Sequence, residues 1–121
     1  MPVAQDISKE RDLLTLVYAA FNARDIDAIL PMMKSNVRWP NGMEGGWVDG
    51  HEGVRAYWTR QWALIDPHVE PVSIEAAPDG RVIVNVHQVV RDLAGLVLMD
   101  RMVQHAYTFS EGLIRTMEIR E

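Results

Sequence analysis

The stretch that most constrains the fold of this chain comprises residues 96–109 and reads LVLMDRMVQHAYTF. It is rich in Val, Met and aromatic residues and contains neither Pro nor Gly, which favours a long central β-strand. Side chains alternate between the two faces of a strand. One face then carries Val97, Met99, Arg101, Val103, His105, Tyr107 and Phe109. A histidine and an arginine beside aromatic residues are unusual on a face that only packs into a core, so we expect this face to line a pocket.

Length and composition favour a single soluble domain over residues 1–121. The net charge is −5 and the acidic residues are spread along the chain, which argues against nucleic acid or an anionic membrane as a partner. The absence of cysteine excludes disulfides, thiolate catalysis and cysteine-ligated metals. No apolar run approaches the roughly 20 residues of a membrane span. The N-terminal segment MPVAQDISKERD lacks the features of a signal peptide, so we expect a cytoplasmic protein.

The chain divides into a helical first half and a strand-forming second half. Apolar spacing, capping residues and glycines predict helices over residues 6–23, from Asp25 onward and over 51–65, a short extended piece at 37–40 and a loop at 41–50. Pro31 should weaken the second helix, and Asp49 and Glu52 have the spacing of a capping box at the third. Strands are expected at 68–77, 81–91, 96–109 and 113–120. This order predicts an α+β fold with helices packed on one face of a curved antiparallel sheet.

Three pieces of the chain carry a family resemblance: YAAFNARDIDAILPMM, VDGHEGVRAYW and QHAYTFSEGLIRTMEI. In this order and spacing they resemble the nuclear transport factor 2-like superfamily, and specifically its SnoaL-like and ketosteroid-isomerase-like branches. The resemblance implies a cone-shaped α+β barrel, with three N-terminal helices over the sheet and a deep pocket between them. It also implies a homodimer formed through the convex face of the sheet.

The resemblance can be carried to individual positions. The isomerase branch uses a tyrosine on the first helix, an aspartate base after the second and an aspartic acid on the central strand. The corresponding positions here are Val17, with Tyr18 beside it, the stretch 39–41, which has no carboxylate, and His105. Steroid isomerisation by that mechanism is therefore not expected. The polyketide-cyclase branch uses a strand acid or histidine as acid/base, and His105 is compatible with that role.

His105 is the first catalytic candidate, because a histidine can exchange protons near neutral pH. The alternative is an interior histidine bonded to a backbone carbonyl or to a tyrosine. Arg101 and Arg91 could bind a carboxylate or an enolate. Their alternative role is to pair with nearby aspartates at the rim or in solvent.

His87 lies on the preceding strand, and its face depends on the loop that joins the two strands. A two-residue turn at residues 94–95 places His87 on the face of Met102. A wider, odd-numbered loop over residues 92–96 places it opposite Arg101 on the pocket face. The resemblance favours the wider loop. So does a dimer face formed by the apolar set that alternates with His87, namely Val82, Val84, Val86 and Val90.

Aromatic residues are numerous enough to wall a pocket for a flat, apolar ligand. The expected ligand-binding residues are Tyr18, Trp39, Tyr57, Trp58, Trp62, Val89, Arg91, Val103, Tyr107 and Met117. The tyrosines among them could donate hydroxyl hydrogen bonds to an oxyanion. The histidines show no local metal-binding spacing, and no glycine loop fits a phosphate.

We therefore expect a cofactor-free acid/base enzyme, of isomerase, cyclase or dehydratase type, acting on an apolar carbonyl compound. His105 would be the acid/base, while Arg101, His87 or a tyrosine would hold the developing oxyanion. One alternative is a non-catalytic ligand-binding domain. Another is a dimerisation domain whose pocket has no function.

Overall fold

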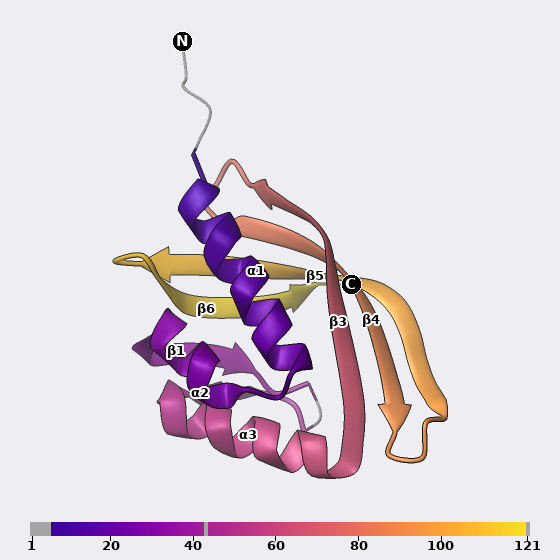
Figure 1. The fold of residues 1–121 in the computed structure, drawn as a ribbon. Coiled ribbons are helices and arrows are strands. Elements are labelled where there is room, and N and C mark those ends of the chain that lie inside the picture. Colours follow the sequence, from indigo (N-terminus) through magenta and orange to yellow (C-terminus); the bar gives the residue numbers. More distant parts are fainter. Residues whose placement is uncertain (1–5, 43, 121) are drawn as a thin grey trace.

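The computed structural model describes residues 6–42 and 44–120 (Figure 1). The elements are α1 (Ser8–Asn22), α2 (Ile26–Ile29), the 3-10 turn η1 (Leu30–Met32), β1 (Met33–Pro40), β2 (Trp47–Asp49), α3 (Gly50–Leu64), β3 (Ile65–Ala76), β4 (Val82–Asp92), β5 (Val97–Ser110) and β6 (Leu113–Arg120). The first residues of the segment judged not to be a signal peptide lie outside the described part of the chain.

The strands form one six-stranded sheet in the order β2-β1-β6-β5-β4-β3. The expected α+β fold, with three helices packed on the sheet, is confirmed, and the sheet is open. The expectation of a purely antiparallel sheet is wrong in one place, because β1 and β6 are parallel. The chain forms β1 before α3 and then adds β3 to β6 as a meander, whose last strand inserts between β5 and β1.

The two N-terminal helices follow the predicted signals. Helix α1 buries Leu14, Val17 and Tyr18, which lie three and four residues apart on one stripe. The Asp25 side chain caps α2 by accepting a hydrogen bond from the Ala28 backbone N–H. Pro31 does not kink this helix, because α2 ends at Ile29 and the proline lies at the start of the 3-10 turn.

Helix α3 forms where predicted, but its start differs from the predicted capping box. Asp49 occupies the N-cap without a side-chain cap hydrogen bond. Its carboxylate instead accepts a hydrogen bond from Arg38 Nε at 3.1 Å, across the paired strands β1 and β2. The helix buries Val54, Tyr57 and Trp58 against the sheet. These side chains form one wall of the space described below.

The hairpin of β4 and β5 contains a β-bulge that decides which residues face the helices. The backbone N–H of Asp92 donates to the carbonyl of Leu96, so the loop has the odd number of residues that we expected. However, the register shifts at Leu98, because Arg91 pairs with Val97 while Val90 pairs with Met99. Because Leu98 is an extra residue in β5, each β4 residue beyond the bulge pairs with the β5 residue one position later than it would in a hairpin without a bulge.

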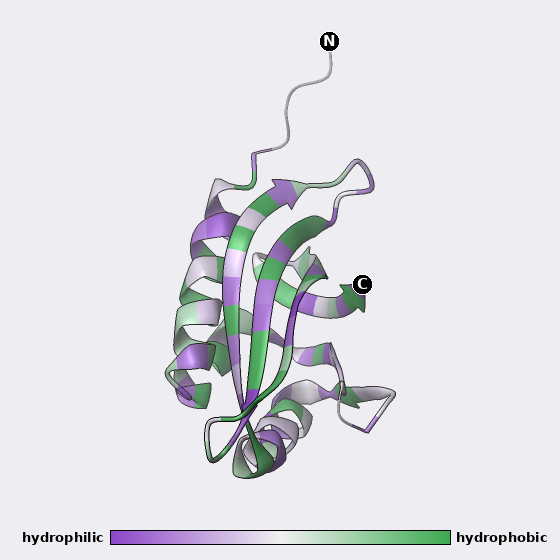
Figure 2. Cartoon of the chain, turned by 90° about the vertical axis from the view of Figure 1, so that its right-hand side faces the viewer, coloured by the Kyte–Doolittle hydropathy of each residue, from purple (hydrophilic) through white to green (hydrophobic). Residues whose placement is uncertain are grey.

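The consequence of the bulge is that His87 pairs with Met102, whereas Val84 pairs with His105. The prediction that His87 shares the pocket face is therefore wrong. The predicted dimer face is wrong for the same reason, because its four members, Val82, Val84, Val86 and Val90, are all buried on the helix-facing side. Figure 2 shows the resulting alternation of hydrophilic and hydrophobic residues along the strands.

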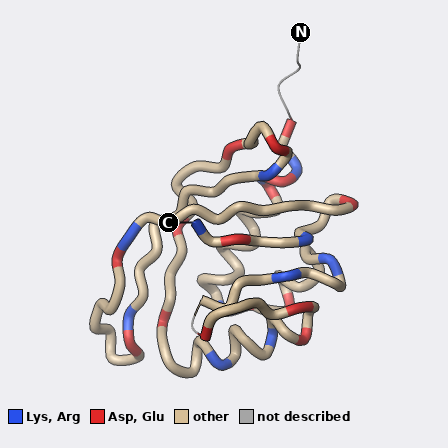
Figure 3. Tube along the Cα trace, turned by 180° about the vertical axis from the view of Figure 1, so that it is seen from behind, with Lys and Arg blue, Asp and Glu red and all other residues tan. Residues whose placement is uncertain are grey.

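Charged residues of both signs are spread along the described part of the chain. In the view from behind, Lys and Arg alternate with Asp and Glu over strands and helices (Figure 3). None of the helices in the described residues is both long and apolar enough to span a membrane.

Candidate functional site

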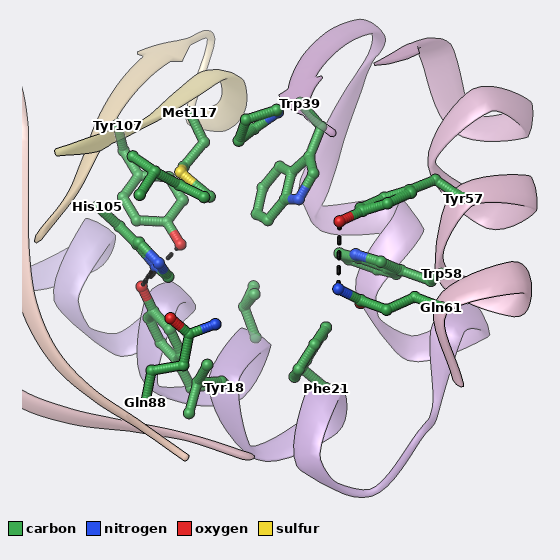
Figure 4. Close-up of a pocket in the computed structure, with 14 residues that line it drawn as sticks. Tyr18, Phe21, Trp39, Tyr57, Trp58, Gln61, Gln88, His105, Tyr107 and Met117 are labelled. Atoms are coloured by element: carbon green, nitrogen blue, oxygen red, sulfur yellow. Dashed lines mark hydrogen bonds between the residues drawn. The ribbon is translucent and has the colours of Figure 1, made fainter. Parts of the chain in front are cut away.

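A cavity of about 70 Å³ lies between α1, α3 and the helix-facing side of the sheet (Figure 4). Its lining residues are Val17, Tyr18, Phe21, Trp39, Pro40, Tyr57, Trp58, Gln61, Val69, Gln88, His105, Tyr107, Met117 and Ile119. Most of these are apolar or aromatic and a few are polar, which is the composition of a small-molecule site. One lining residue, Ile119, is 38% exposed.

Three side chains at one end of the cavity form a continuous hydrogen-bonded chain. The Tyr18 hydroxyl lies 2.7 Å from Nδ1 of His105 and 2.8 Å from the Tyr107 hydroxyl (Figure 4). Helix α1 supplies Tyr18, and alternate positions of β5 supply His105 and Tyr107. All three side chains are buried. Tyr18 is the middle member, because it bonds both others.

Burial sets the protonation state of this chain. Loss of water around the imidazole lowers the pKa of His105 to about 4, so the ring is neutral at pH 7. Burial also raises the pKa of the Tyr18 phenol, and the neighbouring Tyr107 raises it further. The pKa of Tyr107 is raised by burial as well, with a smaller opposing effect from its bond to Tyr18. The cluster is therefore uncharged over the physiological range.

The Nε2 atom of His105 has no hydrogen-bond partner among the described residues. The only hydrogen bond of this imidazole to a described residue is made by Nδ1, to Tyr18. Because the ring lines the cavity, Nε2 is the atom that a bound molecule would meet. A neutral imidazole offers either a donor or an acceptor there, depending on its tautomer.

The α3 side of the cavity carries a second polar group. The Tyr57 hydroxyl accepts hydrogen bonds from the Gly42 backbone N–H and from Gln61 Nε2, both at 3.1 Å (Figure 4). The Oε1 atom of Gln61 is buried and has no hydrogen-bond partner among the described residues. The same holds for Nε1 of Trp62, the next residue on α3. Buried polar atoms without a partner are uncommon, so Oε1 of Gln61, a lining residue, is a candidate acceptor for a polar group of a ligand.

Aromatic rings connect these two polar groups. Trp39 packs edge-on against Trp58, with ring centroids 5.4 Å apart, and contacts Tyr107 at 6.2 Å. Phe21 packs edge-on against both Trp58 and Trp62 at 5.4 and 5.3 Å. Such edge-to-face contacts hold the rings in fixed orientations. The result is a rigid apolar wall suited to a flat ligand.

The end of α1 is held over the sheet by Asn22. Its Nδ2 donates to the carbonyl of Val69 at 2.8 Å, and its Oδ1 accepts from the N–H of the same residue at 3.0 Å. This pair of bonds fixes the distance between α1 and β3, and Val69 lines the cavity.

Many of the residues predicted for the site do line the cavity: Tyr18, Trp39, Tyr57, Trp58, His105, Tyr107 and Met117. Two more are neighbours of it. Trp62 stacks on Trp58 with centroids 5.8 Å apart, and Val103 is buried in the core.

The remaining predicted residues lie elsewhere. His87, Val89 and Arg91 are on the face of the sheet that points away from the cavity, because of the bulge at Leu98. His87 Nε2 is instead hydrogen-bonded to Asp100 at 2.6 Å.

Arg101 lies on the same face of β5 as His105 but does not line the cavity. It is exposed and pairs with Gln88 across the strands. Its Cα is about 13 Å along the strand from that of His105, at roughly 3.3 Å per residue. Arg101 is not among the residues that line the cavity, although its cross-strand partner Gln88 is.

Sequence reasoning missed several lining residues, of which Gln88 and Gln61 are polar. Gln88 became a cavity residue through the same bulge that removed His87. Val17 and Phe21 could have been found, because they lie on the buried stripe of α1 beside Tyr18. Within the described ranges, no three His, Cys, Asp or Glu side chains are grouped closely enough to hold a metal ion.

Comparison with known proteins gives the following matches. The protein family described as the SnoaL-like domain matches residues 14–117 of this chain. The chain is similar to TerC, crystallised with polyporic acid, at 28% identity and a TM-score of 0.80 over 93% of this chain and 90% of TerC. It is also similar to an NTF2-like protein of unknown function from Burkholderia pseudomallei K96243, at 25% identity and a TM-score of 0.81, with coverage of 93% and 90%.

A more distant structure shows the fold alone. A putative polyketide cyclase from Sinorhizobium meliloti is 17% identical, with a TM-score of 0.76 over 90% of this chain and 94% of that one. A search of proteins with curated functions finds no match.

Proposed function

This chain belongs to the SnoaL-like domain family, as the resemblance predicted, and on that premise we propose that it is a single-domain, cofactor-free acid/base enzyme. Its substrate would be a small, largely apolar compound with a carbonyl group, and its reaction of isomerase, cyclase or dehydratase type. The family supports a small-molecule-binding protein of this kind. TerC, which shares the fold, was crystallised with polyporic acid, and this supports an organic ligand for the cavity.

The observation that carries the proposal is the neutral, buried imidazole of His105, which lines the cavity and is held at Nδ1 by Tyr18. All three reaction types begin with transfer of a proton next to a carbonyl group. In the tautomer with a proton on Nδ1, the lone pair of Nε2 can accept that proton. The Tyr18 bond fixes the orientation of the ring, so the base needs no rearrangement before reaction.

A tyrosine is the best candidate to stabilise the oxyanion. His87 lies on the other face of the sheet and Arg101 lies outside the cavity. The Tyr18 and Tyr107 hydroxyls are next to His105, and burial keeps both protonated. A protonated phenol in an apolar site is a strong hydrogen-bond donor to developing negative charge.

The test is release of tritium from the α-carbon of 2-tetralone, a flat aromatic ketone. Wild-type protein should release tritium faster than buffer, and His105→Asn should lower the rate by about a hundredfold. Asparagine places a polar atom near the position of Nδ1, which can bond Tyr18, but provides no Nε2. His68→Asn is the matched control, because His68 is half exposed and paired with Glu70 on β3. An unchanged rate in His105→Asn would contradict the assignment.

A second candidate is a non-catalytic ligand-binding domain. The same low pKa favours it, because an imidazole that resists protonation is a weak base in water. This reading predicts that ketones such as 2-tetralone raise the melting temperature of the protein without release of tritium.

We also propose that the protein forms a homodimer through the convex face of the sheet, the face that points away from the helices. The family resemblance supports this arrangement. Val97 and Met102, which lie on that face, are 48% and 53% exposed. Sedimentation velocity should show a dimer, and Met102→Glu should give a monomer with an intact pocket.

A further inference from the structure

We infer that Tyr107 is a second catalytic residue, the far end of a proton relay that begins at Nε2 of His105 and passes through Tyr18. The relay would accept a proton from the carbon of an enolisable ketone at one end and deliver a proton to its oxygen at the other. This inference rests on the proposed function, because it needs a carbonyl substrate in the cavity.

The geometry of the relay is continuous. One oxygen, that of Tyr18, is bonded to both ends, at 2.7 Å to His105 Nδ1 and 2.8 Å to the Tyr107 hydroxyl. Among the described residues, no charged side chain lines the cavity. His105 and Tyr107 both line it, and their side chains converge on Tyr18 (Figure 4). A ligand lying against β5 can therefore meet both ends at once.

The chain can be hydrogen-bonded in two directions with the same heavy atoms. In the first, Tyr107 donates to Tyr18, Tyr18 donates to Nδ1, and Nε2 carries a proton. In the second, Nδ1–H donates to Tyr18, Tyr18 donates to Tyr107, and the Tyr107 O–H is free to donate into the cavity. The second arrangement presents a base at Nε2 and an acid at Tyr107 simultaneously.

The burial of His105 explains why the proton on Nδ1 must pass to Tyr18 when Nε2 accepts a proton from the substrate. Burial lowers the pKa of His105, so an imidazolium left behind after proton abstraction is unfavourable. If Nδ1 loses its proton to Tyr18 as Nε2 gains one, the ring stays neutral. The same shift gives Tyr107 a proton from Tyr18 as Tyr107 protonates the substrate oxygen. No group in the relay then carries a full charge.

The step balances as follows. The α-C–H bond breaks, and its proton goes to Nε2 while its electron pair forms a C=C bond. The carbonyl π-bond opens, and the oxygen takes the Tyr107 proton to become an enol. Within the chain, one proton passes from Nδ1 to Tyr18 and one from Tyr18 to Tyr107. No oxidant, reductant or further reactant is needed.

The same chain can run backwards. When the ketone carries a C=C bond at its β,γ position, the enol is a dienol, and the Nε2–H group can return its proton to the γ-carbon while Tyr107 takes back the enol proton. The net result is migration of a C=C bond relative to the carbonyl, with the relay restored. The substrate class is therefore an enolisable ketone whose reacting carbon and oxygen lie within reach of two neighbouring residues of β5.

The test compares wild-type protein, Tyr107→Phe and Tyr18→Phe in release of tritium from α-labelled 2-tetralone. Tyr107→Phe keeps the bond between Tyr18 and His105, yet should lower the rate by about a hundredfold, the usual contribution of one acid/base group. Rates are also measured in mixtures of H2O and D2O. The wild-type rate should fall along a curve as the D2O fraction rises, because several solvent-exchangeable protons move together, and that curvature should be reduced in Tyr107→Phe. A structural role alone would not change this curvature.

The outcomes separate the relay from the proposed function. A linear dependence on D2O in wild type, with release lost in His105→Asn but kept in Tyr107→Phe, overturns the relay and leaves His105 as the base. If Tyr107→Phe does not fold, the wild-type dependence alone decides, and a straight line overturns the relay. If wild-type protein releases no tritium from 2-tetralone above the buffer rate, the proposed function fails, and the relay fails with it.

Discussion

The Tyr18 hydroxyl lies 2.7 Å from Nδ1 of His105, although the two residues are 87 positions apart in the chain. The contact joins the first helix to the longest strand inside a buried, uncharged cluster. From the sequence, His105 was interpreted either as a catalytic residue or as an interior histidine bonded to a tyrosine. The structure is consistent with both, because the imidazole is bonded to Tyr18 and also lines the cavity. A partner that satisfies one nitrogen therefore leaves the other available for chemistry.

Tyr18→Phe should lower the free energy of unfolding by about 1–3 kcal/mol, the usual cost of leaving a buried polar group without its partner. The substitution removes one hydroxyl but leaves both His105 Nδ1 and the Tyr107 hydroxyl without their hydrogen bond. Urea denaturation at pH 7 measures the loss. Tyr107→Phe is the matched variant and should cost less, because Tyr18 keeps its bond to His105. Equal losses would show that Tyr18 is not the shared partner.

Stability should fall on acidification because of His105. Its pKa in the folded protein is about 4, whereas an unfolded histidine has a pKa near 6.5. Between these values the unfolded chain binds a proton that the folded protein does not, so acid favours unfolding. The loss begins below about pH 6.5, and by pH 4 it amounts to about 3 kcal/mol for this residue.

The measurement is urea denaturation of wild type and His105→Asn between pH 7 and pH 4. The variant lacks the titrating group, so the difference in unfolding free energy between the two proteins should shift in favour of the variant as the pH falls. Val103→Ala is the control, since it destabilises a buried neighbour on β5 without changing a titrating group. A parallel pH dependence for wild type and His105→Asn would contradict the low pKa.

Local patterns were sufficient to predict most of the elements and the position of His105, but the predicted loop at 41–50 is wrong in part, because it contains the short strand β2 (Trp47–Asp49). The strand face that carries His105 and Tyr107 follows from alternation within one strand, and the buried stripe of α1 follows from helical spacing. Neither depends on the rest of the chain.

Relations between strands were predicted less well. The face on which His87 lies depends on one bulged residue, Leu98, and no turn signal in the sequence indicates this bulge. Because of the bulge, Gln88 lines the cavity and His87 does not. The pairing of β1 with β6 joins distant parts of the chain, so no local pattern indicates that it is parallel. Arg101 was placed on the correct face, but the sequence did not show where along the strand the cavity ends.

Asn22→Ala should weaken both stability and ligand binding. The variant leaves the N–H and C=O groups of Val69 without the partners that Asn22 provides, at a cost of about 1–3 kcal/mol. Because Val69 lines the cavity, movement of α1 away from β3 should also reduce the increase in melting temperature that 2-tetralone produces. Asn22→Asp is the matched variant: it keeps the acceptor for the Val69 N–H and should lose less. If Asn22→Ala has wild-type stability, the pair of bonds does not hold the helix in place.

Tyr57 and Gln61 should respond differently to removal of their polar atoms. Tyr57→Phe leaves the Gly42 N–H and Gln61 Nε2 without their acceptor, so the free energy of unfolding should fall by about 1–3 kcal/mol. Gln61→Met removes one of those bonds but also removes the buried Oε1 that has no partner. Since methionine has a similar volume, the gain and the loss should nearly cancel, to within about 1 kcal/mol. Urea denaturation of the two variants measures the contrast, and a larger loss in Gln61→Met than in Tyr57→Phe would show that Oε1 is already satisfied, by water held in the cavity.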